Sequence, residues 1–216
     1  RRKVLTLEKS RYPDFSVKEV YKDDLDNEVR VSSWPVGEDV EAFMGVDIGS
    51  TSTKLILIDR DRQVLVDIYR KTAGNPIEAT KSLFRALTAL AKRYGSGLTI
   101  LGCGTTGSGR KLVGAVVGAD HVVNEITAHV TGAMTVDPTV DTIFEIGGQD
   151  SKYMRTRNGA IYDSNMNYVC AAGTGSFVEE QAAKLGVSVD EIGPLVMGVA
   201  SPHTSDRCTV FMEQDV

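Results

Sequence analysis

Two glycine-rich loops contain the side chains of this chain that are best suited to chemistry. The first lies in GVDIGSTSTK at residues 45–54. Asp47 ends a predicted buried strand, and such a carboxylate can hold Mg²⁺ through water. Gly49 lets the backbone approach a ligand, and hydroxyls beside backbone N–H groups can surround phosphate oxygens. A tight turn with a capping aspartate is the alternative for this loop alone. The candidate phosphate ligands are Gly49, Ser50, Thr51, Ser52, Thr53 and Lys54.

The second loop lies about 100 residues further along and consists of Gly147, Gly148, Gln149 and Asp150. Like the first, it joins two predicted strands. Gln149 or Asp150 is placed to orient a water molecule or Mg²⁺. Two such loops facing each other would form a cleft, which favours phosphate binding over two unrelated turns.

A third glycine-rich segment, GCGTTGSGRK at residues 102–111, differs from the common nucleotide-binding signatures. A Walker-type loop needs Gly-Lys followed by Ser or Thr, whereas Gly109 is followed here by Arg110, Lys111 and Leu112. The chain also has no G-x-G-x-x-G between a first strand and a helix with an acid about 20 residues further on. A dinucleotide-binding fold is therefore disfavoured.

Short apolar runs that alternate with amphipathic segments predict an α/β architecture around these loops. Pro76 suits the first turn of a helix, and Asn158-Gly159 predicts a hairpin turn. The predicted helices cover residues 76–94, 111–117, 125–135 and 171–185, and the predicted strands cover residues 43–47, 54–59, 64–69, 99–103, 142–146, 151–156 and 160–162.

The organisation of the chain changes near residue 41. Residues 1–41 have crowded charges and scattered apolar positions, which predicts an N-terminal extension or linker. We expect a first lobe over residues 42–138 and a second, incomplete lobe over residues 139–216. Because the chain starts at Arg1, we expect an N-terminus that is either processed or cut from a longer polypeptide.

Composition disfavours several classes of protein. Of the 216 residues, 42% are hydrophobic, which is enough for one large or two small lobes. The net charge of −5 and the lack of a basic run longer than residues 1–3 argue against a nucleic-acid partner. No segment approaches the roughly 18 apolar residues that span a bilayer, and the N-terminus lacks a signal-peptide core. We expect a cytoplasmic protein without a membrane partner.

Six motifs occur in order along the chain and together resemble the activator ATPases of 2-hydroxyacyl-CoA dehydratases and benzoyl-CoA reductases. The resemblance implies the two-lobe α/β fold of actin, Hsp70 and sugar kinases (ribonuclease H-like), with ATP and Mg²⁺ between the lobes. It also implies a homodimer that shares one [4Fe-4S] cluster and passes low-potential electrons, received from a donor such as ferredoxin or flavodoxin, to a dehydratase or reductase. The motifs are GVDIGSTSTK, GTTGSGR, NEITAH, IGGQDSK, CAAGTGSF and CTVF.

By motif, the cluster cysteines of that family correspond to Cys170 and Cys208. Their separation of 38 residues is unlike the close spacing in single-chain ferredoxins, and two thiolates cannot make the usual four-cysteine ligation alone, whereas a symmetric pair of chains can. Cys170 also precedes the predicted helix 171–185, whose first N–H groups favour a thiolate. The alternative is that both are small buried apolar side chains. Cys103, in an apolar strand, we assign to packing.

The resemblance also implies roles at the two loops. Asp47 and Asp150 would organise Mg²⁺ and the attacking water, residues 50–54 would hold the phosphates, and Gly147–Gln149 would contact them from the other lobe. Glu125 begins a predicted helix, where a helix cap and a water-network residue are both compatible with the pattern. His129 on that helix is expected to be structural. Further cofactor-binding candidates are Gly173, Thr174 and Gly175.

Two features depart from the family pattern. Glu145 stands where Asp is usual, and its extra methylene changes the reach of a magnesium or water contact. The chain ends at Val216, where the family continues with its adenosine-binding segment. Similar modules occur within long fused polypeptides, in which a second module could supply the other two cysteines and form a pseudo-dimer.

Two other functions are compatible with the phosphate loops. A sugar or carboxylate kinase of the same fold would use the cleft for phosphoryl transfer. A nucleotide-dependent regulator would keep the loops without catalysing a transfer. Neither needs the pair Cys170 and Cys208, so iron in anaerobically purified protein separates both from the electron-transferring activator.

Overall fold

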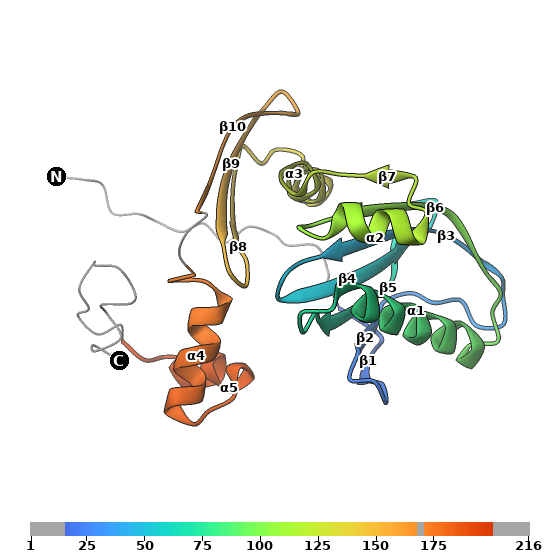
Figure 1. The fold of residues 1–216 in the computed structure, drawn as a ribbon, viewed down its shortest axis with the longest axis horizontal. Helices are drawn as coiled ribbons and strands as arrows, with labels where there is room; N and C mark the ends of the chain where they lie inside the picture. Colours follow the sequence, from blue (N-terminus) through green and yellow to red (C-terminus); the bar gives the residue numbers. More distant parts are fainter. Residues whose placement is uncertain (1–15, 168–170, 201–216) are drawn as a thin grey trace.

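A computed structural model describes residues 16–167 and 171–200 of the chain, and these residues contain two β-sheets with helices packed on them (Figure 1). The first sheet has seven strands in the order β1-β2-β5-β4-β3-β6-β7, and the second has three in the order β10-β9-β8. The strands of the first sheet are β1 (Glu19–Lys22), β2 (Glu28–Val31), β3 (Val40–Ile48), β4 (Ser52–Ile58), β5 (Val64–Lys71), β6 (Leu98–Thr106) and β7 (His121–Val122).

The centre of the first sheet is the antiparallel pair β3–β4, with β6 parallel to β3 on the other side. Residues of β4 alternate between the core and the surface, so that Leu55 and Leu57 are buried. Helices α1 (Pro76–Arg93) and α2 (Arg110–Val117) cover this sheet. Leu83 and Leu90 of α1 complete the apolar core, which fixes the hairpin that carries the first glycine loop.

Residues 19–31, which the sequence pattern assigned to an extension or linker, form two strands of the first sheet. β2 pairs antiparallel with β5, and β1 pairs with β2 at the edge of the sheet. Val29 and Val31 of β2 and the following Trp34 are buried in the same core as α1. Crowded charges on the alternate residues hid the apolar positions of these short strands. The part of the extension that the structure describes is therefore packed on the first sheet.

The second sheet consists of β8 (Thr142–Ile146), β9 (Ser151–Arg157) and β10 (Ala160–Asn167). Asn158 and Gly159 both have positive φ angles, as the predicted turn between β9 and β10 requires. Helix α3 (Glu125–Val136) packs on this sheet, although it precedes the expected lobe boundary near residue 138. The lobe ranges themselves stay a proposal.

Two helices follow the second sheet. Helix α4 (Gly175–Leu185) begins four residues later than predicted, because residues 171–174 make a turn in which the amide of Thr174 bonds the carbonyl of Ala171. Helix α5 (Val189–Val196), which the sequence analysis did not predict, begins with a capping box between Ser188 and Glu191. No helix within residues 16–167 and 171–200 is long and apolar enough to cross a membrane.

Candidate functional site

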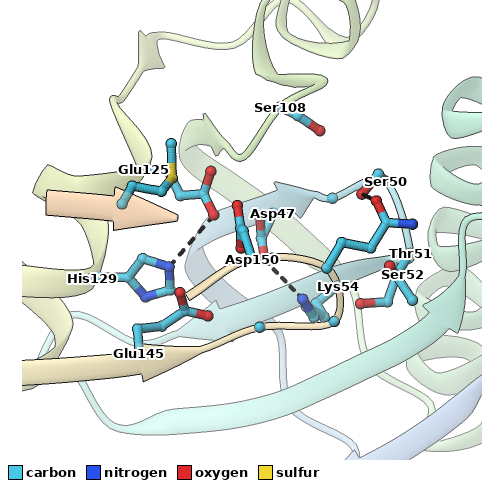
Figure 2. Close-up of a pocket in the computed structure, with 15 residues that line it drawn as sticks. Asp47, Ser50, Thr51, Ser52, Lys54, Ser108, Glu125, His129, Glu145 and Asp150 are labelled. Atoms are coloured by element: carbon cyan, nitrogen blue, oxygen red, sulfur yellow. Dashed lines mark hydrogen bonds and ion pairs between the residues drawn. The ribbon is translucent and has the colours of Figure 1, made fainter. Parts of the chain in front are cut away.

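A cavity of about 290 Å³ lies where the two glycine loops meet (Figure 2). The loops occupy equivalent places in the two sheets, since one connects β3 to β4 and the other connects β8 to β9. Most of the predicted site residues therefore come together in one place. The cavity is lined by Asp47, Gly49, Ser50, Thr51, Ser52, Lys54, Ser108, Glu125, His129, Glu145, Gly147, Gly148, Gln149, Asp150 and Met166.

The register of β3 and β4 places Asp47 opposite Lys54. The Nζ atom of Lys54 lies 3.0 Å from Oδ2 of Asp47, and both side chains are partly exposed to the cavity. Gly49 closes the turn between them by bonding its amide to the carbonyl of Ser52. A Cβ at Gly49 would lie 2.9 Å from that carbonyl oxygen, so only glycine fits here. The loop thus presents one carboxylate and one ammonium group to the cavity.

The hydroxyls of this loop do not all face the cavity. The hydroxyl of Thr53 is buried and lies 2.9 Å from that of Thr72, so Thr53 supports the loop rather than lining the cavity. The hydroxyl of Thr51, in contrast, is buried beside the cavity without a hydrogen-bond partner among the described residues. A buried hydroxyl without a partner costs free energy, and a phosphate oxygen that entered between the two loops would satisfy it.

The second loop touches the first. The amide of Gly147 bonds the carbonyl of Asp150, which closes the turn between β8 and β9. The hydroxyl of Ser50 donates to Oε1 of Gln149 at 2.9 Å. A Cβ at Gly148 would lie 2.9 Å from the hydroxyl oxygen of Thr51. The glycine therefore permits the two loops to approach each other across the cavity.

The third glycine-rich segment supports the first loop from behind. A Cβ at Gly107 would lie 2.5 Å from Oδ1 of Asp47, and a Cβ at Gly109 would lie 2.5 Å from Cγ2 of Ile48. These glycines are required for close packing under the end of β3. Ser108 between them lines the cavity, which the sequence analysis did not predict.

Sequence reasoning also missed Lys152, whose side chain is only 1% exposed. Its Nζ atom lies 2.8 Å from Asp150, 2.9 Å from Glu145 and 3.0 Å from Glu125. Burial alone would lower the pKa of Lys152, but the hydrogen bonds to these three carboxylates raise it. Two sequence signals pointed to it: Lys152 ends the motif IGGQDSK, and it falls in the alternating pattern of β9, in line with the buried Met154.

Glu125 is a pocket residue and not the cap of α3. Asn124 caps the helix, because its side chain accepts a 2.9 Å hydrogen bond from the amide of Ile126. The carboxylate of Glu125 instead faces His129, 3.7 Å away, and Lys152. The imidazole of His129 lowers the pKa of Glu125, and the ammonium group of Lys152 lowers it further. Burial opposes both effects, but the resulting pKa is about 2. Hydrogen bonding to Glu125 also raises the pKa of His129, although burial opposes it.

The start of α4 lies behind the second loop. The amides of Gly175 and Ser176 donate to the carbonyls of Gly147 and Gly148, at 3.0 and 2.8 Å. The hydroxyl of Thr174 also donates to Gly148, at 3.0 Å. Thr174 and Gly175 therefore hold the loop without lining the cavity, and Gly173 lines a separate hollow beside β10.

The cysteines differ in what the structure shows of them. Cys170 and Cys208, the predicted cluster ligands, lie outside the described residues. Cys103 is buried in β6, and this burial, followed by the charge of Asp120, raises the pKa of its thiol. A buried thiol with a raised pKa fits its assignment to packing.

The site's residues fit phosphate and a hydrated cation. The Thr51 hydroxyl and the glycine turns suit phosphate oxygens. Asp47 and Asp150 supply carboxylates from the two sheets, and Mg²⁺ usually takes few carboxylates and keeps several waters. The cavity of about 290 Å³ is at the lower limit of small-ligand sites, so it suits the phosphates of a nucleotide more than the whole molecule.

Comparison with known proteins shows which proteins this chain resembles. Residues 44–216 match the BadF/BadG/BcrA/BcrD ATPase family. The (R)-2-hydroxyglutaryl-CoA dehydratase activating ATPase of Acidaminococcus fermentans is 31% identical over 175 residues, which are 80% of this chain and 65% of that protein. The 2-hydroxyisocaproyl-CoA dehydratase activator of Clostridioides difficile is 33% identical over 179 residues, which are 80% of this chain and 64% of that protein.

A solved structure of the Clostridium difficile activator with bound ADPNP has a TM-score of 0.66 and 31% identity, and the match covers 81% of this chain and 63% of that one. The chain thus spans slightly less than two thirds of the length of the curated relatives described above. The structural matches confirm the expected mixed α/β fold of actin-like ATPases.

Proposed function

This chain belongs to the BadF/BadG/BcrA/BcrD ATPase family, and we propose that its two glycine loops bind the phosphates of MgATP and promote its hydrolysis. The observation that carries this proposal is the hydroxyl of Thr51 beside Gly148 of the facing loop, which has no hydrogen-bond partner within residues 16–167 and 171–200. A nucleotide is bound to one relative, whose structure was solved with ADPNP. Parts of the protein beyond this cavity would contact the adenosine of the nucleotide.

Helix α4 sets the orientation of the second loop. Because the carbonyls of Gly147 and Gly148 accept hydrogen bonds from the start of α4, the N–H groups of the same two peptide planes point the opposite way. These N–H groups belong to Gly148 and Gln149, and both residues line the cavity. They are oriented to donate to phosphate oxygens.

The carboxylates supply the remaining chemistry. Asp47 would hold Mg²⁺ through water, and the bound ion would neutralise charge that develops on the phosphates. Lys54, 3.0 Å from Asp47, would fix that carboxylate and add positive charge to the phosphate side. Asp150 and Gln149 would orient the attacking water, with Glu125 in the same water network. Hydrolysis in this scheme phosphorylates no second substrate.

The proposed role of hydrolysis is to drive electron transfer through a [4Fe-4S] cluster. Four thiolates usually hold such a cluster, so Cys170 and Cys208 would be joined by the same pair from a second copy or a second module. Cys170 comes shortly before Thr174, which is bonded to the phosphate loop. A change in the loop on hydrolysis would therefore reach the cysteine segment through a few residues.

The proposed partners follow from the relatives. Two of them are named as activators of 2-hydroxyacyl-CoA dehydratases, and a component of the benzoyl-CoA reductase of Thauera aromatica is 28% identical over 180 residues. We infer that this protein delivers electrons to a dehydratase or reductase of that class. Ferredoxin or flavodoxin would supply the electrons.

Iron analysis tests the proposal directly. The full-length protein should be purified anaerobically, and its iron content, visible spectrum and ATPase activity measured beside Cys170→Ala, Cys208→Ala and Cys103→Ala. We expect about four irons per pair of modules, lost in the first two variants and kept in the third. Protein that hydrolyses ATP but stays without iron after anaerobic reconstitution would contradict the cluster, and would favour a kinase or a nucleotide-dependent regulator.

A further inference from the structure

We propose that Lys152 is a positioning residue for the hydrolysis in this cleft, which fixes Asp150 and Glu125 without touching the nucleotide. The inference rests on the proposed ATPase activity. Lys152 projects from β9 in the row that contains Met154 and Thr156, which are all buried, and its ammonium group reaches Glu125 of α3. An apolar side chain is the ordinary occupant of such a row.

Three elements meet at this one ammonium group. Glu125 is the first residue of α3, Glu145 lies in β8 directly opposite Lys152, and Asp150 belongs to the second glycine loop. A lysine has three N–H donors, and the three carboxylates lie 2.8–3.0 Å from Nζ. All its donors are therefore engaged, and none remains for a phosphate. Lys54 lines the cavity with a side chain that is 46% exposed, and besides its contact with Asp47 it has donors left for a phosphate.

Structural stability does not account for this lysine. Burying an ion pair has a desolvation cost, and replacing such groups by apolar side chains of similar volume is often neutral or stabilising. The carboxylates themselves are only partly buried, with side-chain exposures of 20–38%. They are exposed toward the cavity, which they line. Lys152 thus holds from behind the carboxylates that face the reacting groups.

Without Lys152 the three carboxylates would repel one another. Each has an oxygen within 3.0 Å of the same nitrogen, so these oxygens lie no more than about 6 Å apart, where like charges repel strongly in a partly buried site. Asp150 and Glu125 would move away from each other or toward the solvent. A displacement of about 1 Å in a catalytic constellation can lower a rate by about 100-fold.

The test compares kcat and KM for MgATP in the full-length protein and its variants. Lys152→Met removes the ammonium group and keeps the bulk of the side chain. We expect kcat to fall about 100-fold while KM changes by less than about 3-fold, because the groups proposed to contact the phosphates, Thr51, Lys54 and the amides of Gly148 and Gln149, are unchanged. Lys81→Met is the matched control: Lys81 also contacts a carboxylate, Glu78 at 2.6 Å, but lies on the exposed face of α1. Its kcat should be unchanged.

A double variant separates positioning from folding. Lys152→Met with Glu145→Gln removes one of the carboxylates that would be left unpaired, and Glu145→Gln alone is its reference. We expect the thermal stability of the double variant to exceed that of Lys152→Met, because one unpaired carboxylate fewer remains, with kcat still far below that of Glu145→Gln. This result would show that Lys152 acts on Asp150 and Glu125 rather than only on Glu145.

The outcomes are distinct. An unchanged kcat in Lys152→Met overturns the assignment, and so does a kcat in the double variant that equals that of Glu145→Gln. A rise in KM as large as the fall in kcat also overturns it, since Lys152 would then act on nucleotide binding. If the unsubstituted protein does not hydrolyse ATP, the proposed function itself is wrong and this inference falls with it.

Discussion

Ser50 and Gln149 are joined by a 2.9 Å hydrogen bond across the cleft, although 99 residues separate them in the chain. Each belongs to a glycine loop at the end of a different sheet. The bond shows that the two sheets meet at their loops, so that groups from both reach one small cavity. Four predictions follow from this arrangement and from the core that supports it.

Gly148→Ala should hold the two loops apart. The added methyl group would lie 2.9 Å from the hydroxyl oxygen of Thr51 and 3.1 Å from its Cβ, and one of the loops must therefore move. We expect the affinity for MgATP, measured by calorimetry, to fall about tenfold, or about 1.4 kcal/mol.

Gly132→Ala is the matched control for this substitution. Gly132 lies within α3 with no atom near an added Cβ, so alanine should raise helix stability by about 0.5–1 kcal/mol and leave affinity unchanged. Equal affinities of Gly148→Ala and the unsubstituted protein would show that the loops do not close on the phosphates as proposed.

Thr51→Val should lower the affinity for MgATP without lowering stability, whereas Thr53→Val should lower stability. Thr51 has a buried hydroxyl without a partner in the described part of the chain, so valine should leave the free energy of unfolding unchanged or raise it, while the affinity for MgATP falls. Thr53 bonds Thr72 in the core, so valine there should lower the free energy of unfolding by about 1 kcal/mol. Denaturant unfolding and nucleotide titration measure the two quantities. If Thr51→Val binds MgATP normally, its hydroxyl is not a phosphate ligand.

The stabilising effect of His129 should depend on pH. Contact with Glu125 raises the pKa of His129 in the folded state. The contribution of His129 to the free energy of unfolding is therefore complete below its pKa in the unfolded state, about 6.5. It is lost as pH rises through the pKa of His129 in the folded state. The Tm of the unsubstituted protein should exceed that of His129→Gln most at low pH, with the gap narrowing as pH rises. A gap that widens with pH would contradict the pairing.

Glu125 should not disturb this measurement. Its pKa is lowered to about 2, so its own contribution is lost only as pH falls below the ordinary range of a glutamate. A series between about pH 5.5 and about pH 9 therefore follows His129, because Glu125 stays ionised throughout.

Trp34→Ala should destabilise the first lobe although residue 34 lies outside the region that matches the family. Trp34 is 4% exposed and packs beside Tyr94, with ring centroids 6.2 Å apart. Loss of a buried tryptophan costs about 3–5 kcal/mol, which chemical unfolding would detect. Val36→Ala, at a residue that is 70% exposed, should change stability by less than about 0.5 kcal/mol. If both substitutions changed the free energy of unfolding by less than about 0.5 kcal/mol, residues 16–41 would behave as a linker and not as part of the folded lobe.

Local patterns predicted most of the fold around the site. The helix at Pro76 and the turn at Asn158-Gly159 were predicted nearly in place, because they depend on neighbours in sequence. The strands β1 and β2 were missed, because four-residue strands among charges give no clear period. The start of α4 was predicted too early, because the turn at residues 171–174 is held by the second glycine loop, far away in sequence.

The sequence by itself determined the two glycine loops, their order and the family, since the residue types of six ordered motifs mark the family and a candidate phosphate site. Only the tertiary structure decided which of those groups face the cavity. It turned Thr53 into the core, left the Thr51 hydroxyl without a partner among the residues that the structure describes, and placed Lys152 among three carboxylates. The physical reason is that burial and pairing of a polar side chain depend on elements that meet only after folding.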